Sequence, residues 1–289
     1  RAMAQAGAGL GQGQAASEAW IAASAAVLTA LDQPELPRRL LEALAAVAPF
    51  ATACSFVYRP RSAPMYVYDT FVDPAHKQAL INYTDSTYVL NPFYAAYLRG
   101  LKTGAHRMRD LAPDTYTPAE LIQSYKAQAS RNEEIGYLTH GWPAGREELC
   151  VAMELPGGEC GEICLSRPAA EGGFSHADVA AYDRVVPFIA TAFRRWWLEA
   201  RPRHLAQSHD RGADAAFAGF GGALLSPRER EIAQLLLRGH SGHSIGAQLG
   251  ISATTVKTHR KNLYAKLGIA THYELFSLFL DSLQGGRPV

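Results

Sequence analysis

The sequence predicts an α+β protein made of an N-terminal αβα sandwich with a mainly antiparallel sheet and a C-terminal all-α domain of four helices. The length of 289 residues gives room for about two domains, each with its own core. Hydrophobic residues make up 48 % and charged residues 19 % of the chain, which is typical of globular rather than disordered proteins. The order of helix-like and strand-like segments favours an antiparallel sheet over a regularly alternating βα fold.

The N-terminal part, residues 17–198, contains helical and strand-like patterns in turn. Ser17, Pro34 and Ser175 suit the first turns of helices, and runs rich in β-branched and aromatic residues are bounded by Pro and Gly. The expected elements are helices over 17–31 and 34–47, strands over 52–58 and 65–71, helices within 74–100 and over 121–130, strands over 134–142, 148–155 and 161–166, and a helix over 175–198. A sandwich of this layout often holds a ligand between the sheet and one helical layer.

Two further segments show no periodic pattern of apolar residues. Residues 1–16, which are rich in Ala, Gly and Gln, are expected to form a mobile tail. Residues 199–224 contain several small residues and three glycines near their end, and we expect them to form a linker.

The formal net charge of +1 hides an uneven distribution along the chain. Residues 1–200 hold 17 Lys and Arg against 21 Asp and Glu, a net charge of −4. Residues 201–289 hold 11 against 6, a net charge of +5. Random surface charge could give these totals, but a basic segment joined to an acidic one also indicates a module that meets an anionic partner.

The C-terminal segment carries the start and stop signals of four helices. The expected N-caps of these helices are Ser226, Ser241, Ser252 and Thr271. Glu229 completes a capping box at the first helix, with Pro227 at the first helical position. Gly250 permits a sharp turn between the second and third helices. This spacing of helix, glycine turn and helix is the layout of a helix-turn-helix unit.

The third of these helices has two opposite faces at about 100° per residue. Its core face carries Val256, Leu263 and Leu267. Its other face carries two cations, a hydroxyl and a small residue, namely Lys257, Thr258, Lys261 and Ala265. Lys can reach guanine O6 or N7, and Thr can bond a base edge or touch a thymine methyl group. Residues 253–267 hold four Lys or Arg and no acidic residue, whereas an ordinary solvated face usually mixes signs.

Phosphate contacts are expected at the margins of this face. Arg260 projects near the core boundary and is expected to extend to a phosphate. Thr254 and Thr255, with the free backbone N–H groups at the helix start, can bind another phosphate. The full set expected to contact double-stranded DNA is Thr254, Thr255, Lys257, Thr258, His259, Arg260 and Lys261.

Residues 225–283 resemble the LuxR/FixJ-type helix-turn-helix domain. The resemblance is carried by residues 225–231, 245–249, 251–259 and 266–268. It implies a four-helix transcriptional DNA-binding domain in which Lys257, Thr258 and Lys261 face the bases. The sequence departs from the family at His243-Ser244, where Lys-Glu is common, and at His272-Tyr273, where Arg is usual.

The fourth helix is rich in apolar residues for a domain of roughly 60 residues. They are Leu275, Phe276, Leu278, Phe279 and Leu280. We interpret part of this helix as a homodimer contact, because a paired module reads a two-fold DNA site. The alternative is that all five side chains pack into the small core of the domain.

An aromatic cluster in the N-terminal part indicates a ligand site. The residues expected to bind a small-molecule effector are Tyr83, Tyr88, Asn91, Phe93, Tyr94 and Tyr97. Tyrosine combines an apolar face with a polar tip, which suits a pocket or a half-wet core. Residues 83–94 are loosely similar to the Tyr…Asp-Pro stretch of acyl-homoserine-lactone sensors. Asn91 replaces the Asp of those sensors and their upstream Trp is absent, so we expect a GAF/PAS-like domain for an unidentified effector, with a lactone receptor as the alternative.

The cysteine pattern predicts neither a metal site nor a cofactor. Cys54, Cys150, Cys160 and Cys164 lie in apolar, strand-like stretches, which is typical of buried, reduced thiols in a cytoplasmic protein. Cys160 and Cys164 have no second pair nearby, as a zinc site would usually need. No run of about 18 apolar residues and no signal sequence is present, so we expect no membrane association.

Other classes of protein find less support in the sequence. Residues 1–120 lack the acidic pattern of a phosphorylated receiver domain, and no catalytic motif indicates an enzyme. An interaction adaptor that has lost DNA binding is disfavoured by the intact face of Lys257 and Lys261. We therefore predict a cytoplasmic, dimeric, one-component transcription regulator, in which residues 17–198 sense an effector and residues 225–283 bind DNA.

Overall fold

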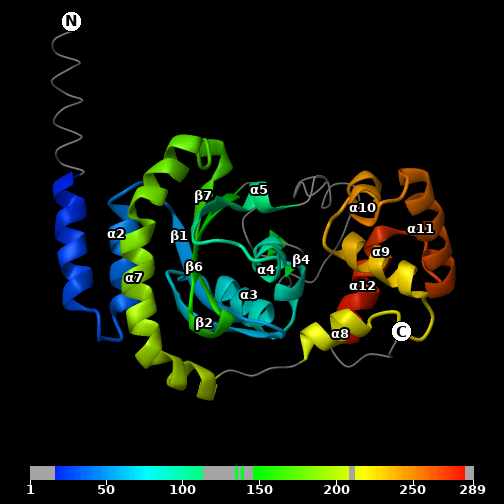
Figure 1. Cartoon of the computed structure of the whole chain (residues 1–289), viewed down its shortest axis with the longest axis horizontal. Helices are drawn as coiled ribbons and strands as arrows, with labels where there is room; N and C mark the ends of the chain where they lie inside the picture. Colours follow the sequence, from blue (N-terminus) through cyan, green and yellow to red (C-terminus); the bar gives the residue numbers. More distant parts are fainter. Residues whose placement is uncertain (1–16, 113–133, 136–137, 140–145, 208–211, 284–289) are drawn as a thin grey trace, which may run out of the picture.

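A computed structural model describes residues 17–112, 134–135, 138–139, 146–207 and 212–283. It has the expected architecture, with an N-terminal sandwich built on an antiparallel sheet and a helical C-terminal part (Figure 1). The tail expected over 1–16 and the helix expected over 121–130 lie outside the described residues.

Five antiparallel strands form the central sheet in the order β2-β1-β7-β6-β3. Their bounds are Thr52–Arg59 for β1, Ser62–Asp69 for β2, Gly104–Arg107 for β3, Arg146–Glu154 for β6 and Cys160–Pro168 for β7. The long strands β1, β7 and β6 occupy the middle, and β2 and β3 form the two edges. The predicted strands over 52–58, 148–155 and 161–166 are confirmed.

The edges of the sheet differ from the sequence predictions. Strand β2 begins at Ser62, so the expected connection over 59–64 is a tight turn in which Arg61 has a φ of 56°. Pro64 fits inside β2 because an edge strand can lack one donor. The expected strand over 134–142 is wrong for the described residues, since Glu134–Ile135 (β4) and Leu138–Thr139 (β5) pair only with each other. Strand β3 takes the edge instead, beside β6.

Helices cover both faces of the sheet (Figure 1). Helices α2 (Leu36–Ala45) and α7 (His176–Gln207) pack on one face and share a core with its apolar side chains. The helix at residues 17–29 lies on the outer side of α2, and its Trp20 packs edge-on against Phe188 of α7. The other face is covered by α3 (Pro74–Asp85), η1 (Thr87–Leu90), α4 (Pro92–Leu98) and α5 (Met108–Leu111). The strand residues divide between the two cores by alternation, because successive side chains point to opposite faces.

The segment expected to be a linker is largely helical. Helix α7 continues past Leu198 to Gln207, where the His204 ring lies 5.2 Å from that of Trp197 and its Nδ1 lies 3.0 Å from the carbonyl oxygen of Tyr66. A further helix, α8, spans Ala213–Gly219. Small residues do not exclude a helix when it has a surface to pack against, and α8 packs against the C-terminal helix α12.

The C-terminal domain consists of α9 (Pro227–Leu237), α10 (Gly242–Leu249), α11 (Ala253–Leu267) and α12 (His272–Leu283). The four predicted N-caps are confirmed, and each accepts a hydrogen bond from the backbone three residues further on. Gly250 closes α10 at a φ of 65°, a conformation that suits glycine. At Gly246 a side chain would lie 2.7 Å from the carbonyl oxygen of Ile251, so glycine also lets the turn approach α10.

Helix α12 buries most of the apolar residues that its sequence contains. Leu275, Phe276 and Phe279 are buried, whereas Leu278 and Leu280 are half-buried. Phe217 and Phe220, in and next to α8, each pack edge-on against the Phe279 ring. Much of the surface expected to form a homodimer contact is therefore covered by the chain itself. No helix in the described ranges has both the length and the hydropathy needed to cross a membrane.

An ion pair between a buried carboxylate and a partly exposed lysine joins α9 to α11. The Glu229 side chain is 5 % exposed, receives a hydrogen bond from the backbone N–H of Ser226, and lies 2.6 Å from Nζ of Lys266. The hydrogen bond from Lys266 lowers the pKa of Glu229 from its usual 4.5 to about 2. The resulting stabilisation is complete above about pH 4.5 and is lost as the pH falls towards 2.

The substitution Glu229→Gln is therefore expected to lower the free energy of unfolding by about 1–3 kcal/mol at neutral pH. The difference from the wild type should shrink at about pH 3, because Glu229 is then protonated in the unfolded chain but still largely charged in the folded protein. Urea unfolding at both pH values measures this. Glu231→Gln, at a more exposed pair with Arg228, is the matched control and should change stability by less than about 0.5 kcal/mol. Equal losses for the two variants would contradict the assignment.

Candidate DNA-binding surface and sensor cavity

One face of α11 is exposed and basic. Lys257, Thr258, Lys261 and Ala265 are exposed, whereas Val256 and Leu263 are buried, as the angular analysis predicts. Neither Lys257 nor Lys261 pairs with a carboxylate among the described residues. Lys266, on the same helix, points to Glu229 on α9 instead. Helix α11 therefore presents Lys257 and Lys261, which have no carboxylate partner among the described residues, on one side, while Lys266 on another side stabilises the contact with α9.

The other predicted DNA contacts lie around this face. Thr254, Thr255 and Arg260 are exposed and His259 is half-buried. The Thr255 hydroxyl lies 2.8 Å from that of Ser252, so it already takes part in the helix cap. The Thr258 hydroxyl donates to the carbonyl oxygen of Thr254 across one helical turn. The cap fixes the first turn of α11, and this in turn fixes the directions in which the exposed side chains project.

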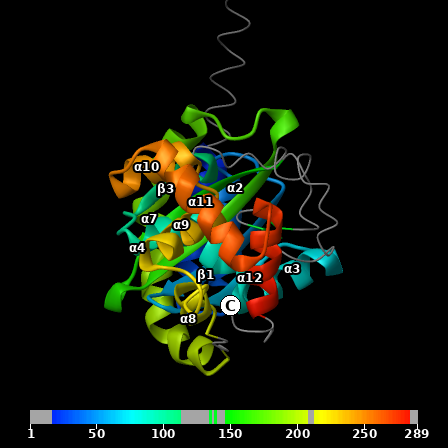
Figure 2. The ribbon, with the colours of Figure 1, turned by 90° about the vertical axis from the view of Figure 1, so that its right-hand side faces the viewer.

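Helix α11 lies away from the central sheet (Figure 1) and faces the viewer in Figure 2. The N-terminal sandwich lies behind the helical domain in that view, so it does not cover the side of α11 that faces the viewer.

His272, at the start of α12, donates its Nε2–H to the carbonyl oxygen of Leu236, and burial lowers the pKa of its ring to about 4. His272, in the segment where the family usually has Arg, is thus a neutral residue that packs inside the domain.

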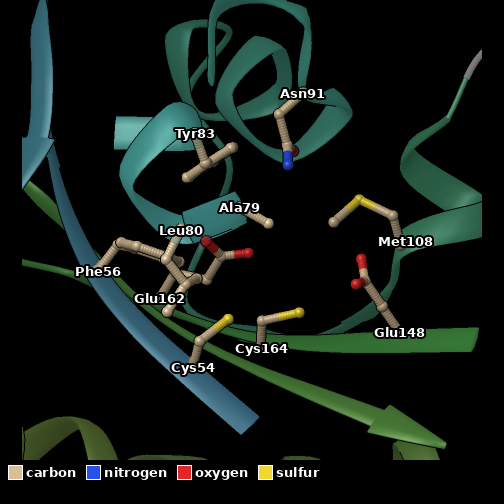
Figure 3. Close-up of a pocket in the computed structure, with 10 residues that line it drawn as sticks. All are labelled: Cys54, Phe56, Ala79, Leu80, Tyr83, Asn91, Met108, Glu148, Glu162 and Cys164. Atoms are coloured by element: carbon tan, nitrogen blue, oxygen red, sulfur yellow. The ribbon is translucent and has the colours of Figure 1, made fainter. Parts of the chain in front are cut away.

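A small cavity lies between the sheet and the helices α3 to α5 (Figure 3). Its volume is about 30 Å³, enough for one or two water-sized groups. The helices contribute Ala79, Leu80, Tyr83, Asn91 and Met108, and the sheet contributes Cys54, Phe56, Glu148, Glu162 and Cys164. The cavity is where the αβα layout predicts a ligand, but its floor is richer in polar groups than the sequence indicates.

Two of the six predicted ligand residues line this cavity. Tyr83 hydrogen-bonds through its hydroxyl to Tyr58, and Asn91 points its amide towards the cavity (Figure 3). Asn91 also caps α4 by accepting a hydrogen bond from the backbone N–H of Phe93 at 2.7 Å. The Asn-Pro pair thus has a structural reason that is independent of any ligand.

The other four predicted residues do not line this cavity, and three of them pack around Tyr58. The rings of Phe93, Tyr94 and Tyr97 lie 5.3–6.0 Å from the ring of Tyr58. The Tyr97 hydroxyl donates to the carbonyl oxygen of Gly158. Tyr88 meets Tyr94 edge-on, with ring centres 5.0 Å apart. These residues form an aromatic core between the cavity and the C-terminal part of the chain.

Tyr88 and Tyr94 both donate to one carboxylate on α8. The Tyr88 hydroxyl lies 2.6 Å from Oδ2 of Asp214, and the Tyr94 hydroxyl lies 2.8 Å from Oδ1. Burial and this hydrogen bond raise the pKa of Tyr94, which therefore stays a neutral donor. The two residues at the centre of the predicted ligand cluster thus attach the sandwich to the segment that leads to the C-terminal domain.

Helix α8 is in turn attached to the C-terminal domain. The side-chain amide of Gln234 on α9 donates to the carbonyl oxygens of Phe217 and Ala218. The guanidinium of Arg238 lies 4.6 Å from the centre of the Phe217 ring. A second cavity, of about 230 Å³, lies between the two parts of the molecule and is lined by Arg238 and, from the sandwich, Leu90 and Arg99 among others.

Sequence reasoning missed the polar residues on the cavity floor. Burial raises the pKa of Glu162 to about 8, although Tyr58 donates a hydrogen bond to it at 2.6 Å. Cys150 and Cys54 hydrogen-bond to Cys164, which lowers the pKa of Cys164, so this thiol is the first of the three to ionise. One signal was available: Glu148-Leu149-Cys150 and Glu162-Ile163-Cys164 repeat one pattern in two strands, with both polar residues on one face.

Comparison with known proteins finds one matching family model and several related regulators. The family model described as bacterial regulatory proteins, luxR family, matches residues 223–279. An HTH-type transcriptional regulator from the exeN 3' region of Aeromonas salmonicida is 31 % identical over 201 residues, which cover 67 % of this chain and 94 % of that protein. The transcriptional regulatory protein MctR of Rhizobium johnstonii is 49 % identical over 57 residues, or 20 % of this chain and 27 % of MctR.

Two solved structures have a weaker likeness to the chain. The VqsR LBD domain from Pseudomonas aeruginosa matches with a TM-score of 0.46 and 20 % identity, over 62 % of this chain and 96 % of that one. Escherichia coli SdiA matches with a TM-score of 0.38 and 16 % identity, over 91 % of this chain and 96 % of that one. Both TM-scores are below 0.5, so neither likeness says what this chain binds.

Proposed function

Because the chain belongs to the LuxR family of bacterial regulatory proteins, we propose that it is a one-component transcription regulator that binds a specific double-stranded DNA site through α11. The observation that carries this proposal is the exposed face of α11, where Lys257 and Lys261 lie free of carboxylate partners among the described residues. A helix with this face can enter the major groove, where Lys reads guanine.

The contacts divide into base-reading and phosphate-binding groups. Lys257, Thr258 and Lys261 face the bases, and Ala265 allows close approach. Arg260 and His259, with Thr254 and Thr255 at the helix start, contact the phosphates on either side. Phosphate contacts fix the position of the helix on the duplex, and base contacts give the sequence preference.

We propose further that residues 17–198 bind a small-molecule effector. The support is the cavity beside Tyr83 and Asn91, which lies where the sandwich leaves space between its layers. A volume of about 30 Å³ favours an effector much smaller than an acyl-homoserine lactone, whose acyl chain would have to displace Phe56, Leu80 or Met108.

The effector signal would pass through the contact between the sandwich and α8. Tyr88 and Tyr94 hold Asp214, and α8 packs on α9 and α12. A ligand that moves η1 or α4 would therefore change where α8 and the DNA-binding domain lie. We propose that the protein acts as a homodimer in the cytoplasm, since paired domains read two-fold sites and all four cysteines are free.

The DNA-binding face is tested by removing its cations. Lys257→Ala and Lys261→Ala are each expected to weaken binding to a selected site by about 1–3 kcal/mol, roughly 5- to 150-fold, and to relax the sequence preference. Binding by the wild type should also fall steeply with salt, because phosphate contacts release counterions. The measurement is fluorescence anisotropy on a DNA site selected from a random library.

Lys266→Ala provides the control for these variants, because it removes the same charge from another side of α11. It should lower thermal stability through Glu229 and leave the sequence preference unchanged. The proposal fails if the Lys257 and Lys261 variants bind the selected site as the wild type does.

The contact with α8 is tested by the double variant Tyr88→Phe/Tyr94→Phe, which removes only the two hydroxyls that Asp214 accepts from. Hydrogen bonds to a charged group contribute about 1.5–3 kcal/mol, so amide hydrogen exchange in residues 213–219 should speed up at least roughly tenfold. Tyr97→Phe is the matched control, since its hydroxyl donates to Gly158 within the sandwich. Unchanged exchange in the double variant, or equal acceleration in both, would contradict the proposed coupling.

A further inference from the structure

Three of the four cysteines lie in a row across the middle of the sheet. Cys164 on β7 is the direct cross-strand partner of Cys54 on β1 and of Cys150 on β6. Paired residues of neighbouring strands share a face, so all three thiols point to the side covered by α3 to α5. All three are buried and none forms a disulfide.

Two carboxylates lie on the same face as the thiols. Glu148 and Glu162 stand two residues before Cys150 and Cys164, and the repeat of two residues along a strand returns to the same face. Glu162 is 2 % exposed and accepts a hydrogen bond from Tyr58. No Lys or Arg of the described chain forms an ion pair with Glu162. A carboxyl group buried in this way keeps its proton unless a cation beside it stabilises the charged form.

The possible metal ligands converge on one point. Sγ of Cys150, Sγ of Cys164 and a carboxylate oxygen of Glu162 all lie within 4.8 Å of one another. In a tetrahedral zinc site the bond lengths place ligand atoms about 3.3–3.8 Å apart. Side-chain rotations that move these atoms by about 1 Å would therefore give that geometry without any change in the strands.

The cavity provides space beside this group of ligands. Figure 3 shows the sulfur of Cys164 beside that of Cys54, with the carboxylates of Glu148 and Glu162 directed into the same space. The volume of about 30 Å³ suits a single ion with one further small ligand. Three protein ligands and an accessible fourth position are a common arrangement for zinc that also binds a small molecule.

We propose that Cys150, Cys164 and Glu162 bind one thiophilic divalent cation of the zinc class beside the sensor cavity, which Cys164 and Glu162 line. Two thiolates and a carboxylate offset the charge of the ion, and each thiol and the carboxyl group of Glu162 release their protons to solvent as they bind. The mixed sulfur and oxygen set excludes Mg²⁺ and Ca²⁺, which take oxygen ligands only. This inference deepens the proposed sensing function, because it gives the effector a chemical class.

The test is a titration of the fully reduced, full-length protein with Co²⁺ and with Zn²⁺. We expect one equivalent of Co²⁺ to give thiolate-to-cobalt charge-transfer bands, and one equivalent of Zn²⁺ to remove them. Mg²⁺ at the same concentration should give no change. Absence of thiolate–cobalt bands in the reduced, folded wild type would overturn the proposal without any use of variants.

Single-residue variants then test which side chains bind the ion. Cys150→Ala and Cys164→Ala should each weaken Co²⁺ binding at least roughly a hundredfold, and Glu162→Gln should weaken it at least roughly tenfold. Cys160→Ala is the matched control, because Cys160 is also buried on β7 but lies outside the ligand group. Circular dichroism checks that each variant is folded. Equal binding by the Cys160 and Cys164 variants would overturn the assignment.

A separate measurement distinguishes the site from the regulatory function. DNA affinity is measured for the wild type and for Cys164→Ala, with and without one equivalent of Zn²⁺. A change of DNA affinity on addition of Zn²⁺ that occurs in the wild type and not in Cys164→Ala would support the ion as the effector. Stoichiometric ion binding with DNA affinity unchanged by Zn²⁺ would overturn the effector role, and specific DNA binding without any ion binding would overturn the metal site while leaving the proposed regulator intact.

Discussion

The unlike character of the two faces of the central sheet is the constraint on which the rest of the structure depends. One face presents mainly apolar side chains, such as Val57, Val151 and Ile163, to α2 and α7. The other presents tyrosine, thiols and carboxylates to α3, α4 and α5. A slip of one residue in strand register would bury Glu162 against the tryptophans of α7, so the register is strongly fixed by burial. The polar cavity exists because that register holds.

The aromatic side chains above this face join the cavity to the DNA-binding domain. Tyr58 contacts Glu162 on one side and packs against Tyr94 on the other. Tyr94 reaches Asp214, and α8 continues to the Phe279 ring in the C-terminal core. A packed chain of this kind carries a signal only if some member has two positions. Helix α8 is the natural candidate, because the side-chain hydrogen bonds that it forms with Tyr88 and Tyr94 depend on one carboxylate, Asp214.

The sequence allowed the C-terminal domain to be predicted almost completely, because each helix carries its own cap, as Ser226 and Ser252 show. It also predicted the long central strands, because runs rich in β-branched and aromatic residues, bounded by Pro and Gly, mark them. It did not predict strand β3, since Gly104–Arg107 has little intrinsic strand preference and depends on β6 for its structure. It also did not predict helix α8, because Ala213–Gly219, although rich in alanine, is too short to be a stable helix without its contact with α12. The group around Cys164 depends on cross-strand register, which residues more than a hundred positions apart do not reveal.

The edges of the sheet limit how two copies of this protein can meet. Strand β3 has four residues, and β2 contains Pro64, which cannot donate a hydrogen bond. Neither edge offers a second chain a long row of free backbone donors and acceptors. Two copies therefore cannot merge their sheets into one continuous ladder, and any pairing must use helical surfaces. The same blunt edges protect a sheet rich in Val, Ile and Cys from the uncontrolled strand addition that leads to aggregation.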